Sequence, residues 1–403
     1  MSRLLMRRKI YDAFIIAALF FAVVALLLFP QESMQGVTDG LTLCINVLIP
    51  SLFPFFVLSS LMVKLGVAQY FGKILEPVMR PLFNVGGACS SAFVLGFVGG
   101  YPVGAKTAIS LYENGCIEKD EAERLLAFSN NSGPAFILGV VGVGIFASSR
   151  VGLMLYAAHA VASIIVGILF RNWGRRRSKQ AVQYGGDNPV REQRQARSFQ
   201  DVRFSRAFVQ SVTGAFQTTL NICAFVIFFT VFIRLLFLAG IIPAAATFLG
   251  GVLARLGLDP TWAETLVIGF IELTSGVWSL NAAAGELSSA IAMVAFMLGW
   301  AGLSVHCQVL SFIGDSGLSV RSYILGNFLH GGISAVLIFI LTRIMPFHTD
   351  VASYLVEGVQ GIAAMDFGAT IRISSFSALF LWTAVLLICL MKRARMRQKR
   401  LSN

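Results

Sequence analysis

Charged residues are scarce in this sequence. Only 13% of its 403 residues are Asp, Glu, Lys or Arg, whereas 56% are hydrophobic and the mean hydropathy is +0.76. A single water-soluble core cannot hide so much apolar surface. The composition therefore excludes an ordinary soluble protein and predicts a polytopic integral membrane protein whose main solvent is the lipid bilayer.

The sequence also lacks the patterns that carry most enzyme chemistry. Its six cysteines form no CxxC pair, no HExxH motif occurs, and no GxSxG turn stands near a plausible histidine partner. The glycine-rich stretch 99–106 does not have the spacing of a phosphate-binding loop. We therefore expect no catalytic residue, no metal site and no cofactor, and we expect the protein not to be an enzyme.

The basic residues are confined to a few places. A formal net charge of +12 would indicate a nucleic-acid partner in a soluble protein, but here Lys and Arg gather in segments 3–9, 171–206 and 392–400, which flank apolar runs. Cytoplasmic segments of membrane proteins hold the excess of Lys and Arg. We expect no nucleic-acid partner, and we expect both termini and the central segment to be cytoplasmic. The predicted outer loops, 31–40 and 346–372, are poor in basic residues.

The apolar runs are of two kinds. About 20 apolar residues cross the hydrocarbon core, and by this measure uninterrupted spans are expected at 13–29, 41–64, 137–169, 211–238, 322–344 and 374–391. Gly, Pro, Ser or Asn interrupt the runs 88–111, 125–137, 265–280 and 288–313, which we interpret as broken or re-entrant helices. Amphipathic stretches at 68–83 and 243–256 are expected along the interface or beside the bundle.

The spans, the interrupted runs and the amphipathic stretches occur twice in the same order, with the second copy about 173 residues after the first. The predicted topology places the copies in opposite orientations, so the sequence predicts an all-α membrane fold of two inverted repeats with discontinuous helices. Chance likeness among hydrophobic helices is the alternative. The expected divisions are an N-terminal transmembrane helix (1–40), a first repeat (41–170), a basic cytoplasmic linker (171–206), a second, inverted repeat (207–345), and an outer loop, last helix and basic tail (346–403).

The breaks are the candidate binding sites, because irregular backbone at membrane depth must be buried in protein or line a wet cavity. In the first repeat the break holds Asn130, Asn131 and Ser132, with Ser132 expected to cap the following half-helix. Its free N–H groups would favour an anion. A kinked helix that only packs Asn and Ser against its neighbours is the alternative.

Two charged residues lie in the other breaks. Lys106 follows the glycine-rich break at 99–104 and is expected either to meet an acid or a substrate anion or to extend to an interface. Glu272 lies at the matching place in the second repeat, with Thr274 and Ser275 beside it. It is expected to carry a proton or a cation, to pair with Lys106, or to be a salt-bridged acid that holds the halves together.

The last polar break, 302–308, contains Ser304 and His306. His306 is interpreted either as a ligand that responds to pH or as a satisfied core histidine. Arg234, inside the span 211–238, either holds an anion or extends to the interface. His159 and His330 are expected to be packing residues.

Three motifs carry a family resemblance: LIPSLFPF at 48–55, GFVGGYPVGA at 96–105 and NNSGPAF at 130–136. Together they resemble the YlbJ family of sporulation integral membrane proteins, also called SpoVV, which carries the nucleoside recognition or Gate domain related to the core of concentrative nucleoside transporters. The resemblance implies the outer forespore membrane, with the termini on the mother-cell side, and a role in moving dipicolinic acid toward the spore.

The residues predict a transporter for a small organic anion that works by alternating access at the repeat interface, and the resemblance implies that the anion is dipicolinate. The binding residues expected are Lys106, Asn130, Asn131, Ser132, Thr274, Ser275, Ser304 and His306, with Glu272 as the site of ion or proton coupling. A scaffold protein of the forespore envelope and a nucleoside-type carrier are the alternatives. The sequence leaves open whether the protein forms a homo-oligomer or assembles with other sporulation membrane proteins.

Overall fold

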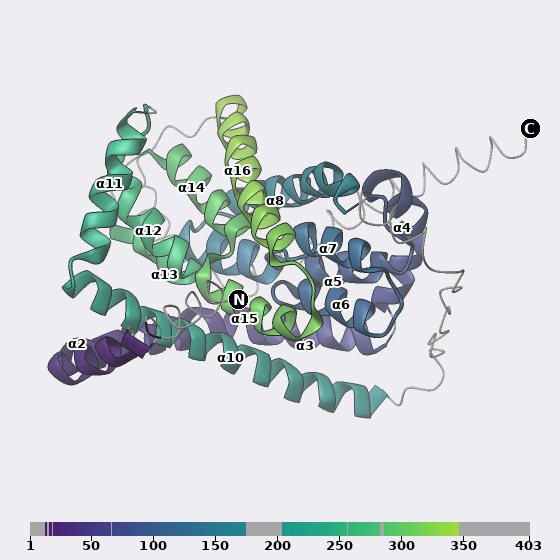
Figure 1. Cartoon of the computed structure of the whole chain (residues 1–403), viewed down its shortest axis with the longest axis horizontal. Helices are drawn as coiled ribbons and strands as arrows, with labels where there is room; N and C mark the ends of the chain where they lie inside the picture. Colours follow the sequence, from purple (N-terminus) through teal and green to yellow (C-terminus); the bar gives the residue numbers. More distant parts are fainter. Residues whose placement is uncertain are drawn as a thin grey trace, which may run out of the picture.

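The computed structural model of the chain describes residues 13, 16, 17, 19–65, 67–174, 204–255, 257–282 and 286–345 (Figure 1). Every regular element in this part of the chain is a helix. Five helices here are long and apolar enough to cross a membrane: Pro30–Met62, Ser149–Asn172, Phe204–Leu238, Leu287–Gly314 and Val320–Ile344. The N-terminal basic patch, most of the basic linker, the loop after 345, the predicted helix 374–391 and the basic tail lie outside the described residues.

The two halves contain the same series of elements. In the first half these are α2 (Pro30–Leu43), η1 (Cys44–Leu48), α3 (Ile49–Lys64), α4 (Val67–Phe83), α5 (Cys89–Gly99), α6 (Val103–Glu113), α7 (Lys119–Phe128), η2 (Ala135–Ile145) and α8 (Ser149–Leu169). In the second half they are α10 (Phe204–Leu238), α11 (Ile241–Arg255), α12 (Ala263–Ile271), α13 (Leu273–Trp278), α14 (Leu287–Trp300), α15 (Gly302–Ser316) and α16 (Val320–Ile344). Each half thus has a long helix, an amphipathic helix, a broken hairpin, a broken helix and a final span.

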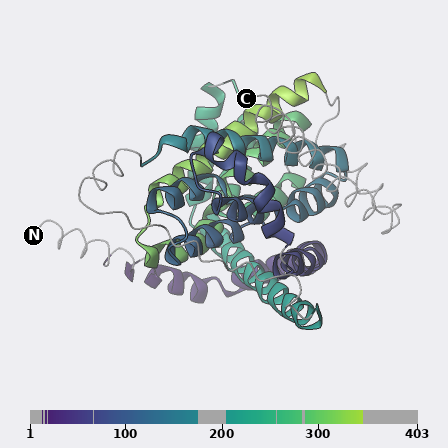
Figure 2. The same ribbon diagram turned by 90° about the vertical axis from the view of Figure 1, so that its right-hand side faces the viewer.

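The long helices of the two halves run antiparallel. A Cβ atom on Gly36 would lie 3.0 Å from Val231 Cα, and one on Gly40 would lie 2.9 Å from Ile227 Cα. Residue numbers therefore rise along α2 in the direction in which they fall along α10. Figures 1 and 2 show the purple α2 and the teal α10 together along the lower edge of the molecule. The corresponding helices therefore point in opposite directions, as inverted repeats require.

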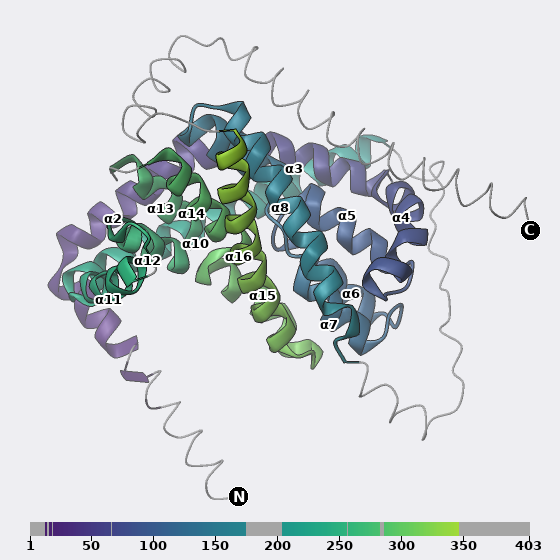
Figure 3. The same cartoon turned by 90° about the horizontal axis from the view of Figure 1, so that it is seen from above.

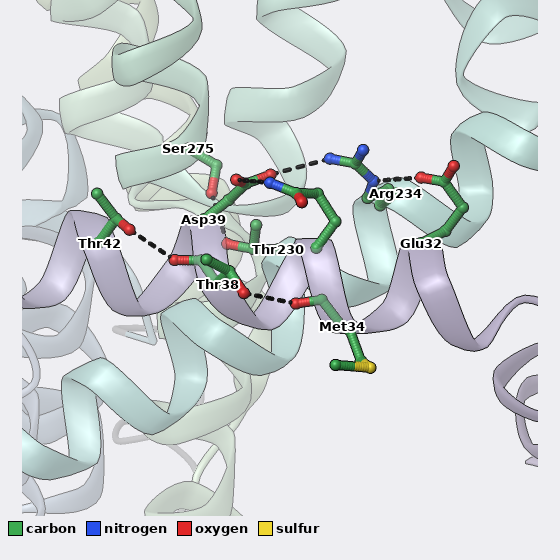
Figure 4. Close-up of polar contacts among 9 residues, drawn as sticks. Glu32, Met34, Thr38, Asp39, Thr42, Thr230, Arg234 and Ser275 are labelled. Atoms are coloured by element: carbon green, nitrogen blue, oxygen red, sulfur yellow. Dashed lines mark hydrogen bonds and ion pairs between the residues drawn. The ribbon is translucent and has the colours of Figure 1, made fainter.

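The predicted outer loop at 31–40 is wrong, because this segment is helix α2. Pro30 occupies the first turn, where its missing N–H costs nothing, and Glu32 lies there too. Glu32 and Asp39 accept hydrogen bonds from Arg234 of α10 at 2.7 and 2.9 Å (Figure 4). The sequence left open whether Arg234 holds an anion or extends to the interface. In the structure its anionic partners are Glu32 and Asp39.

The predicted single span at 137–169 is also wrong. Helix η2 ends at Ile145, Ala147 adopts a positive φ of 49°, and Ser148 caps α8 by accepting a hydrogen bond from the Val151 N–H. The run is longer than one crossing needs, and a left-handed residue followed by an N-cap turns the chain back on itself.

The four expected helix breaks are present. They lie at 100–102 between α5 and α6, at 129–134 between α7 and η2, at Glu272 between α12 and α13, and at Ala301 between α14 and α15. The last is a correction, because the break was expected over 302–308. Ala301 and Gly302 have φ angles of 75° and 79°, so these two residues make the whole turn. Ser304 and His306 therefore lie on the first turns of α15.

Candidate functional site

Three of the four breaks, at 100–102, 129–134 and Glu272, line one cavity between the two halves together with the first turns of α15, which follow the fourth break. The volume of this cavity is about 60 Å³, enough for a few water molecules. Aromatic and aliphatic side chains of α3 and α10 form one wall, and the breaks form the other. The lining residues are Leu52, Phe55, Phe56, Gly99, Gly100, Tyr101, Ser132, Gly133, Ala135, Phe136, Ile222, Phe225, Val226, Glu272, Leu273, Thr274, Ser304, Val305 and Gln308.

In each half, the hairpin touches the broken helix through its backbone. A Cβ atom on Gly100, whose φ is 69°, would lie 2.9 Å from the Gly133 nitrogen. In the second half, a Cβ atom on Gly302 would lie 2.9 Å from the Leu273 nitrogen. Because both φ angles are positive and the approach is so close, only glycine fits these two positions without strain. Backbone groups, not long side chains, therefore bring the breaks together.

The break at 129–134 is buried and rich in unsatisfied oxygen atoms. Ser132 is fully buried and lines the cavity, and its Oγ has no hydrogen-bond partner among the described residues. Oγ of Ser129 and Oδ1 of Asn130 and Asn131 are likewise buried without a partner there. The Ser132 N–H is occupied, since it donates to His159 Nε2 at 3.0 Å. This N–H is therefore not free to bind an anion. The predicted capping by Ser132 is wrong, because the N-cap of η2 is Pro134 and no side chain caps this helix.

Glu272 is the charged group of the cavity. Its side chain is 2% exposed, and it caps α13 by accepting a hydrogen bond from the Ser275 N–H at 2.6 Å. The Ser275 hydroxyl lies 3.3 Å from that of Thr230 on α10 (Figure 4). Thr274 lines the cavity beside Glu272, whereas Ser275 does not. The hairpin tip is thus connected to the long helix of its own half.

The structure separates Ser304 from His306. Ser304 lines the cavity, but the His306 ring is buried away from it, with Nδ1 2.8 Å from the Tyr323 hydroxyl. Asn130 also belongs to this second cluster, because its Nδ2 donates to the Tyr323 hydroxyl and to Asn327 Oδ1 at 3.3 Å each. Asn131 donates to the Phe128 carbonyl oxygen at 3.1 Å. These three predicted residues are placed behind the cavity wall.

Lys106 lies outside the cavity. Its side chain is exposed, and Nζ lies 5.4 Å from the centroid of the Phe312 ring. The predicted pairing with Glu272 is therefore not present. Of the described residues that line the cavity, Glu272 is the single one with a carboxylate or a basic side chain.

Several residues of the site carry no clear signal in the sequence. Tyr101 follows a glycine pair and lines the cavity, and its hydroxyl donates to the Leu298 carbonyl oxygen at 3.2 Å. Tyr323, Asn327 and His330 come from α16, which reads as an ordinary apolar span. A polar side chain inside such a span was the available signal, since these groups are costly in lipid.

Three comparisons bear on this geometry. Residues 45–171 match the family model Gate, described as nucleoside recognition. The chain is 30% identical over 341 residues to the sporulation integral membrane protein YlbJ of Bacillus subtilis (strain 168), covering 83% of this chain and 84% of that protein.

The fold is similar to solved structures of CNTnw, a concentrative nucleoside transporter. A single-substitution variant of CNTnw in its intermediate 1 state aligns with a TM-score of 0.50 and 14% identity, covering 81% of this chain and 87% of that one. The same variant in its intermediate 2 state aligns with a TM-score of 0.52 and 13% identity, covering 82% of this chain and 85% of that one. The arrangement of broken hairpins and broken helices is therefore similar to the fold of CNTnw.

Proposed function

The chain belongs to the family of the sporulation integral membrane protein YlbJ, and from this premise we propose that it is a membrane carrier for a small organic anion, dipicolinate. The observation that carries the proposal is that three helix breaks, two from the first half and one from the second, line one cavity together with the first turns of α15. In inverted-repeat carriers the substrate lies at this interface, and access alternates as one part rocks against the other.

Dipicolinate is a planar aromatic dianion, and the aromatic side chains Phe55, Phe56, Phe136 and Phe225 give the cavity a surface on which such a ring packs. The difficulty is Glu272, because an ionised carboxylate in a site of low dielectric repels an anion. We propose that Glu272 takes up a proton when the anion binds. The protonated carboxyl is neutral and can donate a hydrogen bond, so proton and anion move together.

The cavity volume of about 60 Å³ is well below the size of an ordinary ligand pocket. Substrate entry therefore requires the breaks to separate. We propose that the hairpin tips at Gly100 and Glu272 move relative to α3 and α10, and that the protein acts in the outer forespore membrane with its termini on the mother-cell side.

The test is uptake of labelled dipicolinate into vesicles that contain only this protein, at a series of external pH values. We expect wild-type uptake to rise as the pH falls and Glu272→Gln to lose most of this dependence. Glu264→Gln is the matched control, because Glu264 is an exposed acid on α12 outside the cavity. If vesicles at normal protein levels take up no dipicolinate and no nucleoside, the carrier proposal is wrong and a scaffold role is favoured.

A nucleoside-type carrier is the second candidate. The match of residues 45–171 to the nucleoside recognition model favours it, and Glu272 in its ionised form would accept hydrogen bonds from the hydroxyls of a neutral sugar. Uptake of labelled nucleosides in the same vesicles, abolished by Glu272→Gln and unaffected by dipicolinate, would establish it and exclude the anion.

A further inference from the structure

Two buried histidines meet where the halves join. His159 of α8 and His330 of α16 are each 1% exposed, and their ring centroids lie 4.2 Å apart with an interplanar angle of 33°. They occupy equivalent positions in the repeat, at the same distance along the chain from the serines, Ser148 and Ser319, that cap their helices. Figure 3 shows α8 and α16 side by side. The pair therefore lies near the pseudo-symmetry axis that relates the halves.

The partners of the two rings determine which nitrogen atoms carry hydrogen. A backbone N–H can only donate, so His159 Nε2, which is 3.0 Å from the Ser132 nitrogen, is the acceptor and carries no hydrogen. A carbonyl oxygen can only accept, so the His330 Nε2–H donates to the His159 carbonyl oxygen at 2.9 Å. His159 is therefore neutral in this arrangement, and His330 supports its backbone.

Ser132 is the residue that these contacts control. It lines the cavity, its Oγ is buried without a partner among the described residues, and the next residue, Gly133, contacts Gly100 of the hairpin. The backbone at Ser132 belongs to no helix, so the ladder of main-chain hydrogen bonds does not hold it. The bond to His159 supplies the acceptor that a buried N–H requires.

We propose that His159 is a positioning residue of the binding site, which holds Ser132 and its free hydroxyl toward the cavity, and that His330 connects this support to the second half of the molecule. The expected effect of His159 on transport rests on the proposed carrier function. Its expected effect on the backbone of the break at 129–134 does not. Hydrogen bonding, not ring packing, is the property that matters at position 159.

Two substitutions at position 159 separate hydrogen bonding from ring packing. His159→Phe keeps a ring of similar shape against His330 but removes the acceptor, whereas His159→Gln loses the ring but keeps a neutral acceptor oxygen. Tyr156→Phe, a buried change on the same helix, is the control. His159→Leu replaces His159→Phe if the latter does not accumulate in the membrane.

The first measurement is hydrogen–deuterium exchange of the full-length protein in detergent, read from peptides covering 129–137. We expect His159→Phe to speed exchange in this segment about tenfold, and His159→Gln to stay within about threefold of wild type, since loss of one bond removes local protection. His330→Leu should have a smaller effect, because it leaves the acceptor for Ser132 in place.

The second measurement is dipicolinate uptake in vesicles, where His159→Phe should lose most activity and His159→Gln should retain most of it. Unchanged exchange at 129–137 in His159→Phe would overturn the proposal, and so would equal damage by Phe and Gln in folded protein. If the wild type transports nothing, the carrier function fails, but the exchange measurement still decides whether His159 positions the break.

Discussion

Replacing Gly104 by alanine tests the closest helix contact of the site. The carbonyl oxygen of Ser129 lies between α5 and α6, where a Cβ atom on Gly104 would be 1.9 Å from it and 2.7 Å from Gly96 Cα. Real Cβ contacts are not shorter than 3.0 Å, so the break must move by roughly 1 Å. Overpacking of a close-packed interior costs about 1–3 kcal/mol, and we expect the unfolding midpoint to fall by roughly 2–6 °C.

The assay is thermal unfolding of the purified protein in detergent, followed by uptake in vesicles. Gly332→Ala is the matched control, because Gly332 lies in helix α16 and a Cβ atom placed on it would meet no atom within 4 Å among the described residues. In an open helical position alanine is favoured over glycine by about 1 kcal/mol, so this variant should be at least as stable as wild type. Equal midpoints for Gly104→Ala and wild type would show that the Ser129 carbonyl is not held between the two glycines.

Three further predictions concern single side chains. Arg234→Gln should lower the unfolding midpoint only slightly, and less in high salt, because ion pairs exposed to this degree contribute about 0.2–1 kcal/mol each. Tyr323→Phe should cost about 1–3 kcal/mol in the same assay, since it leaves His306 and Asn130 buried without the hydroxyl; an unchanged midpoint would mean that water replaces it. Lys106→Gln should leave uptake at the wild-type rate, because the side chain lies outside the cavity, and a severe loss would place it on the transport path.

The breaks were predictable because their causes are local. Glycine and proline at 99–104, the run of Asn, Ser, Gly and Pro at 130–134, and an acid inside an apolar run at 272 each oppose a continuous helix within a few residues. The order of these signals indicated the repeat, and the topology predicted from the basic segments indicated its inversion. Ser132, Glu272, Thr274 and Ser304 were found among the cavity residues for the same reason.

Two of the differences between prediction and structure involve partners far away in the sequence. The segment 31–40 reads as a loop because it is polar, and it is helical since Arg234 and the backbone of α10 lie against it. Of the alternatives for Lys106, pairing with Glu272 is not present, because helix α6 directs the side chain toward Phe312. Whether a side chain faces the cavity depends on the rotation of its helix, which neighbouring helices set.

The scarcity of charge, the placement of the basic segments, the spacing of apolar runs and the residues that interrupt helices indicated by themselves that this chain is an all-helical membrane protein with two inverted, broken halves. These are properties of the backbone in lipid, where every polar group must find a partner within reach. Only the tertiary structure decided that His159 takes the Ser132 N–H, that Tyr323 joins His306 to Asn130, and that Glu272 is the charged group of the cavity. Each of these hydrogen bonds joins different segments of the chain, and the packing of those segments, not their local sequence, selects which polar side chains meet.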